Sequence, residues 1–336
     1  MRIAFIGIRH WHAKHYYLTV AKLSQHQIVG VSDPDTAVLN KVGVELGVAT
    51  YTDYRDLLEA QRPNFVFIFA PHAELAGIAA DVIEQGVPCL IEKPGGINSQ
   101  QISALRQNAS IKNLHVGTGF NFRVSDFYHQ VMTLIEDDEV TWGSFRFIAG
   151  FPSRYLETKN DWMLDPGKSG GGCTINLSIH FFDLFCEFTR SLPTEVSALM
   201  GHHSWGLDVE DYSSVALRSE QALCTVETGY TFPSSAQRVF DILFAVRTRA
   251  HYLKANSNGV IEIYRNSDSS LKEVITPSIG NSYWYPQFVE QTLSRFERGL
   301  PPIADLHSLE RAMQLVDSAY VCARNNARLH TPSHST

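Results

Sequence analysis

The 336-residue chain lacks several features that mark whole classes of protein. It has no excess of basic residues, because 28 Lys and Arg stand against 35 Asp and Glu, and this balance gives no reason to expect nucleic-acid binding. No apolar run approaches the roughly 20 residues of a membrane-spanning helix, and the first residues enter a strand pattern without the basic region of a secretory signal. We therefore expect a cytoplasmic protein with neither nucleic-acid nor membrane partners.

Cysteine is also scarce and scattered. An odd number of widely spaced cysteines, mostly within apolar runs, is typical of buried free thiols in a reducing compartment, and it excludes a disulfide framework or a zinc site as the first interpretation. The five are Cys89, Cys173, Cys186, Cys224 and Cys322.

Glycine is missing where a dinucleotide fingerprint would place it. The segment "RIAFIGIRHWHAKHYY" begins as an apolar strand that turns at Gly7, but Arg9 and His12 stand at the next two glycine positions. Two interpretations stay open: the side chain of Arg9 binds phosphate beside a helix N-terminus, or the cofactor site has decayed. The cluster of His10, His12 and His15 also suggests a metal site, but no acidic or thiol ligand accompanies it, so cofactor-lining or surface histidines are preferred.

The first third of the chain alternates short apolar runs with helical patterns. Most of the runs "IAFIG", "QIVGVS", "FVFIFA", "PCLIEKP" and "LHVGTGF" are apolar throughout, as expected of parallel strands covered on both faces. Amphipathic segments lie between them, at 10–23, 35–47, 53–60, 72–86 and 99–109. Right-handed crossovers then give a doubly wound sheet with a ligand crevice at the carboxyl ends of its strands.

The pattern changes after about Phe120. A helical segment leads to a strand, a glycine-rich turn and an apolar helix near 173–188, followed by alternating strands and two closing amphipathic helices near 284–298 and 306–324. Alternation predicts a largely antiparallel open sheet with one buried face. The fold class is α/β followed by α+β, with domains at 1–120 and 121–330 and a disordered tail at 331–336.

Two acidic residues follow the second strand. Asp33 lies about 26 residues beyond Gly7, near the position of the acid that accepts the ribose hydroxyls of a dinucleotide. A carboxylate there repels a 2′-phosphate and favours NAD over NADP. The other interpretation is a helix N-cap, which suits Asp35 better.

Polar residues stand out in two further segments. "IEKPGG" places Glu92, Lys93 and Pro94 at the mouth of a parallel strand. In "SGGGCTINLSIHFFDLFCEF", a polar stripe with intervals of four, three and four residues shares one face of an otherwise apolar helix, and it consists of Asn176, His180, Asp183 and Glu187. The preceding Gly170 to Gly172 leave room for a ligand or the neighbouring domain. A structural His–Asp pair is the plain alternative, but so many aligned polar residues favour a site.

Together these segments resemble the glucose–fructose oxidoreductase, inositol dehydrogenase and rhizopine-catabolism family (Gfo/Idh/MocA). The resemblance extends through nearly the whole chain and includes "TDYRDLL", "AP" at 70–71, "EKP" at 92–94, "GFNFR" at 119–123, "GGG" before "INLSIHFFD", and "LERAMQLVDSAYVCAR". It implies an N-terminal Rossmann domain that binds a nicotinamide cofactor. It also implies a C-terminal domain whose open sheet forms the interface of a homodimer or homotetramer.

The resemblance also implies roles for individual residues. The catalytic residues would be Lys93, His180 and Asn176, the last in place of a frequent aspartate. The cofactor would contact Gly7, Ile8, Arg9, His10, His12, Asp33, Ala70, Pro71, His72, Glu92, Lys93 and Asn121. The substrate would contact Lys93, Arg123, Trp162, Asn176, His180 and Asp183. No metal is expected. Departures from the family pattern are the two lost glycines, Ser178 in place of a common glycine, and Leu75 in place of a common histidine.

The leading hypothesis is an NAD-dependent dehydrogenase that oxidises a ring hydroxyl of a sugar or cyclitol, or runs the reverse reduction. His180 would accept the hydroxyl proton, Lys93 would hydrogen-bond the developing alkoxide, and Asn176 would orient the substrate or the imidazole. Two alternatives stay open. One is a regulatory or sensor protein that binds the cofactor without turnover, and the other is a glycosidase or epimerase that recycles a tightly held NAD.

Overall fold

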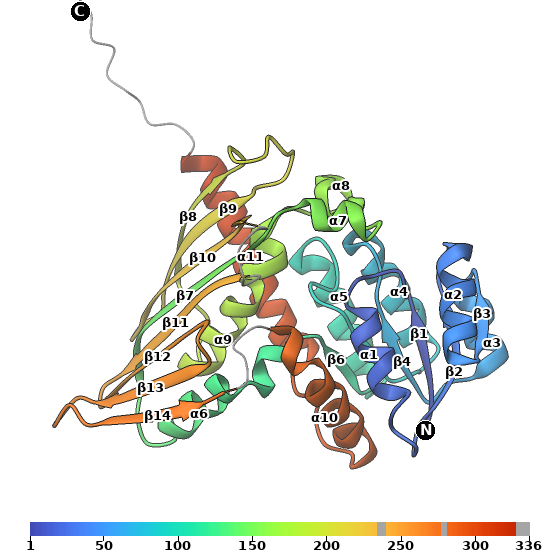
Figure 1. Ribbon diagram of the computed structural model, residues 1–336, viewed down its shortest axis with the longest axis horizontal. Helices are drawn as coiled ribbons and strands as arrows, with labels where there is room; N and C mark the ends of the chain where they lie inside the picture. Colours follow the sequence, from blue (N-terminus) through green and yellow to red (C-terminus); the bar gives the residue numbers. More distant parts are fainter. Residues whose placement is uncertain (234–239, 277–280, 327–336) are drawn as a thin grey trace, which may run out of the picture.

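The apolar runs of the first third form one parallel sheet, seen at the right of Figure 1. The computed structural model describes residues 1–233, 240–276 and 281–326, and the strand order of its first sheet is β3-β2-β1-β4-β5-β6. The strands are β1 (Arg2–Ile6), β2 (Gln27–Ser32), β3 (Ala49–Tyr51), β4 (Phe65–Ile68), β5 (Cys89–Ile91) and β6 (Val116–Thr118). The order reverses between β1 and β4, so their carboxyl ends border a crevice.

Helices cover both faces of this sheet, which completes the predicted doubly wound arrangement. The helices α1 (Ala13–Val20) and α2 (Thr36–Leu46) pack on one face. The other face is covered by α3 (Tyr54–Gln61), α4 (His72–Glu84) and α5 (Ser99–Ile111). The carboxylate of Asp35 accepts hydrogen bonds from the backbone N–H groups of Ala37 and Val38, so the predicted N-cap of α2 is confirmed.

The second sheet has eight strands in the order β14-β13-β12-β11-β7-β10-β9-β8. All neighbouring pairs are antiparallel except β7 and β10, which run parallel. The strands are β7 (Val140–Gly150), β8 (Glu195–Gly201), β9 (Tyr212–Arg218), β10 (Leu223–Phe232), β11 (Phe240–Thr248), β12 (His251–Asn256), β13 (Val260–Arg265) and β14 (Leu271–Ile275). The predicted largely antiparallel sheet is therefore confirmed.

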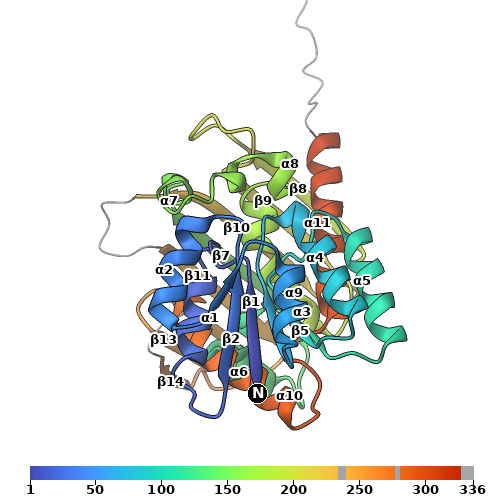
Figure 2. The same cartoon turned by 90° about the vertical axis from the view of Figure 1, so that its right-hand side faces the viewer.

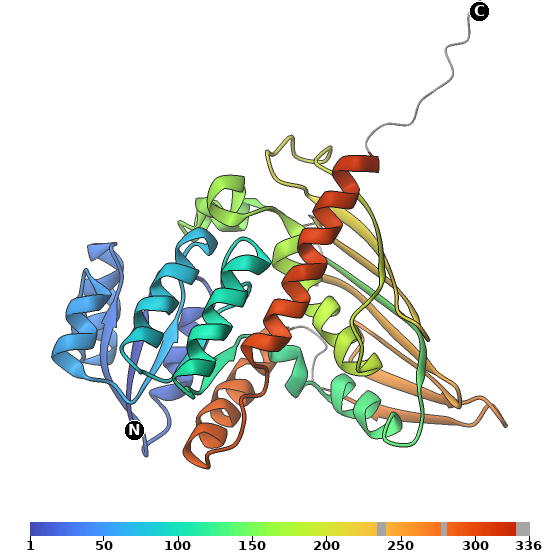
Figure 3. The same ribbon diagram turned by 180° about the vertical axis from the view of Figure 1, so that it is seen from behind.

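The helices of the second half lie on one face of this sheet, between it and the first domain (Figure 1). They include α6 (Asp126–Leu134), α9 (Ile179–Thr189) and α11 (Leu306–Asn326), and a π-helical turn over Thr174–Ser178 leads into α9. Figure 3 shows α11 running past α5 and along the sheet. A hydrogen bond from Ser99 N to Asp317 joins α11 to α5, and one from Ala198 N to the Cys322 sulfur joins it to β8.

Two short helices of the second half reach over the crevice of the first sheet. They are α7 (Ser153–Glu157) and α8 (Pro166–Ser169), and Figure 2 shows them above the upper ends of the parallel strands. In addition, α10 (Tyr285–Glu297) returns to pack on α1, where Tyr285 and Phe288 lie against Tyr16. The last third of the chain therefore contributes to both halves of the molecule.

One hydrophobic cluster is continuous across the two sheets. It contains Val66 and Ile68 of β4, Phe181 of α9, and Phe145 of β7, all buried. Such a shared apolar core resists relative movement of the two halves. Among the described residues, no helix is both long and apolar enough to span a membrane, and the tail predicted to be disordered, 331–336, lies outside the described residues.

Candidate active site

The crevice at the carboxyl ends of β1, β2 and β4 contains a cavity of about 530 Å³. Its walls come from the first domain and from Asn160 and Trp162, which lie in the segment between α7 and α8 of the second domain. Several predicted cofactor residues line it, namely Gly7, Arg9, His10, Asp33, Ala70 and Pro71, together with the predicted substrate residue Trp162. The predicted cofactor residues Ile8, His12, His72, Glu92, Lys93 and Asn121 are buried outside that lining.

Gly7 is required by the packing of the turn that follows β1. Its φ is +77°, and a Cβ at this position would lie 1.7 Å from the carbonyl oxygen of Phe69. The loop beyond it uses much of its own hydrogen-bonding capacity, because Arg9 N donates to Asp33 Oδ2 at 2.8 Å and His12 N donates to His10 Nδ1 at 3.2 Å. These amides are thus engaged within the chain, and the guanidinium of Arg9 is the cationic group of this loop that can contact a phosphate.

Asp33 lies at the end of β2, where the ribose-binding acid was predicted. Its side chain is 3% exposed and borders the cavity, and burial raises its pKa. Each oxygen accepts one backbone hydrogen bond, from Arg9 N and from Asp35 N at 2.9 Å. A carboxylate oxygen has two lone pairs, so both oxygens keep acceptor capacity; the ribose contact stays a prediction.

The Glu92–Lys93 turn follows β5 and is buried. Lys93 Nζ donates to the backbone oxygen of Asn176 at 2.7 Å and to its Oδ1 at 2.6 Å, which joins the two domains. Glu92 Oε1 lies 3.1 Å from His12 Nδ1. Burial lowers the pKa of Lys93 to about 8 and raises the pKa of Glu92 to about 8, since removal from water disfavours either charge.

The side-chain amide of Asn176 is fixed by hydrogen bonds to the second domain and to Lys93. It lies in the π-helical turn, and its Nδ2 donates to the hydroxyls of Tyr155 at 2.8 Å and of Tyr230 at 2.9 Å. Its Oδ1 is the acceptor for Lys93, so the amide orients the lysine, whereas the sequence predicted that it would orient the substrate or the imidazole.

His180 lies at the start of α9, four residues after Asn176, and is 3% exposed. Neither ring nitrogen has a hydrogen-bond partner among the described residues, and the ring packs against Phe120 and Phe122. Burial, and after it the charge of Lys93, lowers its pKa well below the usual value. His180 is therefore a neutral imidazole with two unsatisfied nitrogens, as expected of a group that awaits a ligand.

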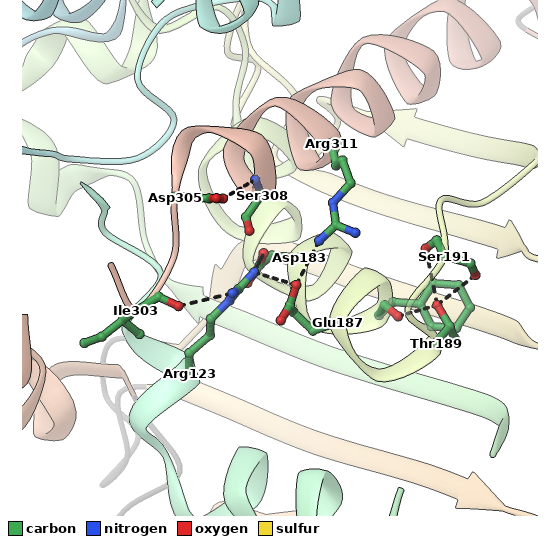
Figure 4. Close-up of polar contacts among 10 residues, drawn as sticks. Arg123, Asp183, Glu187, Thr189, Ser191, Ile303, Asp305, Ser308 and Arg311 are labelled. Atoms are coloured by element: carbon green, nitrogen blue, oxygen red, sulfur yellow. Dashed lines mark hydrogen bonds and ion pairs between the residues drawn. The ribbon is translucent and has the colours of Figure 1, made fainter. Parts of the chain in front are cut away.

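The rest of the predicted polar stripe points elsewhere. Asp183 and Glu187 both face Arg123, as Figure 4 shows. Arg123 Nε donates to Asp183 Oδ2 at 2.8 Å, and Arg311 Nη2 donates to Glu187 Oε1 at 2.8 Å. This network ties α9 to α11 and to the turn that carries Arg123 and the fully buried Asn121. The charged atoms of Arg123 and Asp183 face each other here, and their contact with substrate stays a prediction.

An aromatic layer lies between the cavity and the Lys93–Asn176 contact. The ring of His10 stacks on that of Trp11 with 3.9 Å between the ring centres, and Trp162 packs against Trp11 and His72. Trp11 in turn meets Tyr155, whose hydroxyl contacts Asn176. His72 is fixed by a 2.7 Å contact from its Nδ1 to the oxygen of Ser169, and burial lowers its pKa to about 3.

The glycine-rich turn before Asn176 serves packing rather than ligand access. A Cβ at Gly171 would lie 1.8 Å from the hydroxyl of Tyr320, and one at Gly172 would lie 2.0 Å from the backbone oxygen of Glu210. Gly170 lies against Ile97 of the first domain, so the predicted approach of the neighbouring domain is confirmed while the ligand alternative is not. The Glu210 carboxylate accepts from Gly172 N and Thr174 N and fixes this turn.

Sequence reasoning missed Tyr155 and Tyr230, which contact Asn176, and Arg154, which contacts both tyrosines. Nothing in the local pattern of their segments connects them with Asn176, because Tyr155 is 21 residues and Tyr230 is 54 residues away from it. The described part of the chain contains no group of three or more His, Cys, Asp or Glu side chains arranged to hold a metal ion.

Comparisons with known proteins agree with this geometry. Residues 1–120 match the family model described as "Oxidoreductase family, NAD-binding Rossmann fold", and residues 131–245 match the GFO/IDH/MocA C-terminal domain. The chain is 27% identical over 176 residues, 52% of its length, to the rhizopine catabolism protein MocA of Rhizobium meliloti. It is 28% identical over 203 residues, 59% of its length, to the UDP-N-acetylglucosamine 3-dehydrogenase of Acidithiobacillus ferrooxidans.

The matched stretches span 53% and 58% of these two curated relatives, which is about half of their length. Among solved structures, an oxidoreductase from Agrobacterium radiobacter in complex with NAD+, L-tartaric acid and magnesium superposes with a TM-score of 0.85. It is 17% identical and the match covers 97% of this chain and 96% of that chain, so it shows the fold. With both of its domains matched, the chain belongs to the GFO/IDH/MocA family of oxidoreductases, and its first domain is an NAD-binding Rossmann domain.

Proposed function

We propose that this protein is an NAD-dependent dehydrogenase that oxidises a ring hydroxyl of a sugar or cyclitol, or catalyses the reverse reduction. The observation that carries the proposal is a buried lysine bonded to Asn176, together with His180 four residues further on, whose ring nitrogens have no partner among the described residues. Relatives support it, since one is a UDP-N-acetylglucosamine 3-dehydrogenase.

The residues present fit a dinucleotide. The cavity is bordered by the Asp33 carboxylate and by Arg9, and the imidazole nitrogens of His180 are buried without partners among the described residues. Asp33 would accept the ribose hydroxyls, and Arg9 would contact the pyrophosphate. When bound, NAD supplies the hydride acceptor for the chemistry.

The chain's own residues handle the substrate proton and the developing charge. His180, neutral because of its burial, accepts the proton of the hydroxyl as the carbon loses its hydride. Lys93, as the ammonium, donates a hydrogen bond to the developing alkoxide oxygen. With the bound cofactor as hydride acceptor, the secondary alcohol would become a ketone, and His180 would carry the hydroxyl proton away. Asn176 keeps Nζ of Lys93 in place through two contacts.

A sensor that binds the cofactor without turnover is the second candidate. The observation in its favour is the loop after Gly7, whose amides at Arg9 and His12 are already bonded within the chain.

The proposed enzyme has a further property, assembly as a homodimer or homotetramer through the open face of the second sheet. Its cytoplasmic location remains a prediction.

Two measurements separate the candidates. NAD binding is followed by titration, and NADH formation is followed at 340 nm with a panel of sugars, sugar acids and cyclitols. Turnover that disappears in both Lys93→Met and His180→Asn, each with unchanged NAD affinity, would support the dehydrogenase. Binding of NAD without turnover of any panel member would favour the sensor, and an absorbance near 340 nm in the purified protein would point to a retained, recycled cofactor.

A further inference from the structure

Arg154, on α7, is a partly buried cation without an acidic partner. Its Nη1 donates to the oxygen of Gly150 at 2.5 Å and its Nη2 donates to the hydroxyl of Tyr155 at 2.9 Å. No Asp or Glu among the described residues lies within ion-pair distance of its guanidinium. The segments outside the description, 234–239, 277–280 and 327–336, contain no Asp or Glu in their sequence.

The guanidinium is nevertheless held in one place. Its central carbon lies 4.7 Å from the ring centre of Tyr155 and 5.1 Å from that of Tyr230, both fully buried tyrosines. Contacts of this kind stabilise and orient a cation. The guanidinium of Arg154 is therefore held in a position where its N–H groups can donate two hydrogen bonds to a planar acceptor such as a carboxylate.

Tyr155 adds a further donor beside this fork. Its hydroxyl accepts from Arg154 Nη2 and from Asn176 Nδ2, which occupies both lone pairs, so its own proton can go to an acceptor, either the neighbouring Tyr230 hydroxyl or a ligand. Through Asn176 the same hydroxyl is linked to Lys93. The donors of Arg154 and Tyr155 thus lie next to the residues proposed to act on the hydroxyl of the substrate.

Arg154 adds a positive charge near Lys93 without an acidic partner of its own among the described residues. The positive charge of Arg154 contributes to lowering the pKa of Lys93, after the larger effect of burial. The carboxyl group of the adjacent Glu92 contacts His12, and burial raises its pKa, which disfavours the negative charge that would offset Lys93. Positive charge that is buried without a counterion is unfavourable, and an anion bound there offsets that cost.

From this arrangement we infer that the substrate carries a carboxylate, which binds Arg154 and the Tyr155 hydroxyl, while the hydroxyl to be oxidised lies at Lys93 and His180. The inference rests on the proposed dehydrogenase function and narrows its substrate class from neutral sugars and cyclitols to sugar acids of the uronate type. A planar carboxylate matches the guanidinium fork with two parallel hydrogen bonds, which a neutral hydroxyl cannot do.

The test compares matched substrate pairs. Initial rates of NADH formation are measured with glucuronate against glucose and galacturonate against galactose, with glucose 6-phosphate as the phosphate-bearing probe. The wild type is expected to have a kcat/KM on the order of 100-fold higher for the acid of a pair. Arg154→Met removes most of that preference, and Arg154→Lys, which keeps the charge without the fork, retains an intermediate preference of about 10-fold.

Controls separate a substrate role from a structural one. Arg249→Met, at an arginine whose side chain is 71% exposed, should leave the preference unchanged, and NAD affinity should be unchanged in Arg154→Met because Arg154 does not line the cofactor cavity. A higher kcat/KM for the neutral sugars overturns the inference. So does an Arg154→Met variant that loses activity equally on both members of a pair, or a preference for glucose 6-phosphate over the acids.

The inference can fail independently of the proposed function. If no panel member is turned over, the dehydrogenase proposal fails, and calorimetric titration of the NAD-loaded protein with glucuronate and galacturonate then decides. Binding of an acid to the wild type that is lost in Arg154→Met supports the carboxylate site. Equal binding to both proteins, or no binding of any acid, overturns it.

Discussion

Lys93 and Asn176 form the contact on which the proposed chemistry depends most. Family members often carry an aspartate at the position of Asn176, but here an amide accepts from the ammonium and donates both of its protons to tyrosines. An amide fixes the position of Lys93 without adding negative charge. The neutral state of His180 is favoured by the same lack of charge.

Replacing Asn176 by aspartate tests this electrostatic account. A carboxylate beside Lys93 stabilises nearby positive charge, so the pKa values of Lys93 and of His180 should both rise. Because neutral His180 is the proposed base, the acidic limb of the pH profile of kcat should move to higher pH, by about one unit. Asn108→Asp, at an exposed position of α5, serves as the control. An acidic limb that stayed in place or moved to lower pH would refute the account.

Arg9 should contribute directly to cofactor affinity. It is the cation at the cavity beside the turn after β1, and its backbone amide is already bonded to Asp33. Arg9→Ala should weaken NAD binding about 10-fold, as loss of a charge-assisted contact does, and should leave the binding of adenosine, which has no phosphate, unchanged. Fluorescence titration of both ligands measures this, with Arg298→Ala as an exposed control. Equal NAD affinity in Arg9→Ala would mean that Arg9 does not contact phosphate.

Buried His72 should make the protein sensitive to acid. Its pKa is about 3 in the folded chain against 6.5 for an ordinary histidine, because burial disfavours the charged ring. Between these values the unfolded chain binds a proton that the folded chain does not, so the free energy of unfolding falls as the pH falls through 6.5. One such group accounts for about 2 kcal/mol between pH 6.5 and pH 5.

The matching variant is His72→Gln, whose amide can still donate to the oxygen of Ser169. The difference in unfolding free energy between pH 7 and pH 5, measured by urea denaturation, should be smaller by about 2 kcal/mol than in the wild type. His129→Gln, at an exposed position of α6, should leave the difference unchanged. An unchanged difference in His72→Gln would contradict the assignment.

Single residues were predictable from the sequence where a local pattern marks them. Lys93 follows an apolar strand, and Asn176 and His180 interrupt an apolar helix, so each stands out within its own segment. Their partners do not stand out. Lys93 and Asn176 are 83 residues apart, and no local pattern connects either of them with Arg154.

Among the elements, those with a strong hydrophobic pattern were predicted and those with weak burial were missed. The buried and exposed residues of β9 alternate, which is the pattern that predicted alternating strands in the second half of the chain. β3 and β14 contain no fully buried residue, so neither periodicity marks them. The π-helical turn was predicted as part of a continuous helix, because the extra residue in its turn leaves no signal in the spacing of apolar residues.

The turn before Asn176 should be intolerant of any side chain. In Gly172→Ala the new methyl group would lie 2.0 Å from the backbone oxygen of Glu210, which cannot move freely because it also accepts from Cys173 N. Overpacking of this kind costs about 3 kcal/mol. The free energy of unfolding should therefore fall by that amount. Gly77→Ala, in α4 with no atom near the new methyl group, should instead raise it by about 0.5–1 kcal/mol in the cofactor-free protein. Equal stability of the wild type and Gly172→Ala would show that the turn adjusts.

The relative position of the two sheets is fixed by segments of the C-terminal part of the chain that pack on the first domain. α10 and α11 return to the first domain, and the backbone of Thr118 on β6 donates to Ala304 just before α11. Local patterns predicted the helices themselves, but not their placement, because the contacts join residues far apart in sequence. The shared core brings Lys93 of one domain and Asn176 of the other into contact without a hinge.

The second sheet leaves its outer face uncovered within the described chain, since all helices of the second half lie on its inner side (Figure 1). Large apolar side chains on this sheet are exposed on four neighbouring or near-neighbouring strands: Leu199 at 68%, Leu223 at 49%, Leu243 at 41% and Tyr212 at 38%. Exposed apolar area of this kind on an open sheet is typical of a subunit interface. The proposed homodimer or homotetramer would cover it.

Charged substitutions on this face should therefore dissociate the assembly. Leu223→Glu combined with Leu243→Glu places two carboxylates within the proposed interface. Light scattering after size-exclusion chromatography should then show a lower molar mass than for the wild type, with the 37.7 kDa monomer as the lower limit. Ile111→Glu introduces the same charge at a residue that is 84% exposed on α5 of the first domain, so its mass should equal that of the wild type. Because the cavity and the proposed catalytic residues lie within one chain, the dissociated variant should still bind NAD with wild-type affinity. A wild type that is monomeric at micromolar concentration, or a double variant of unchanged mass, would show that this face is not the interface.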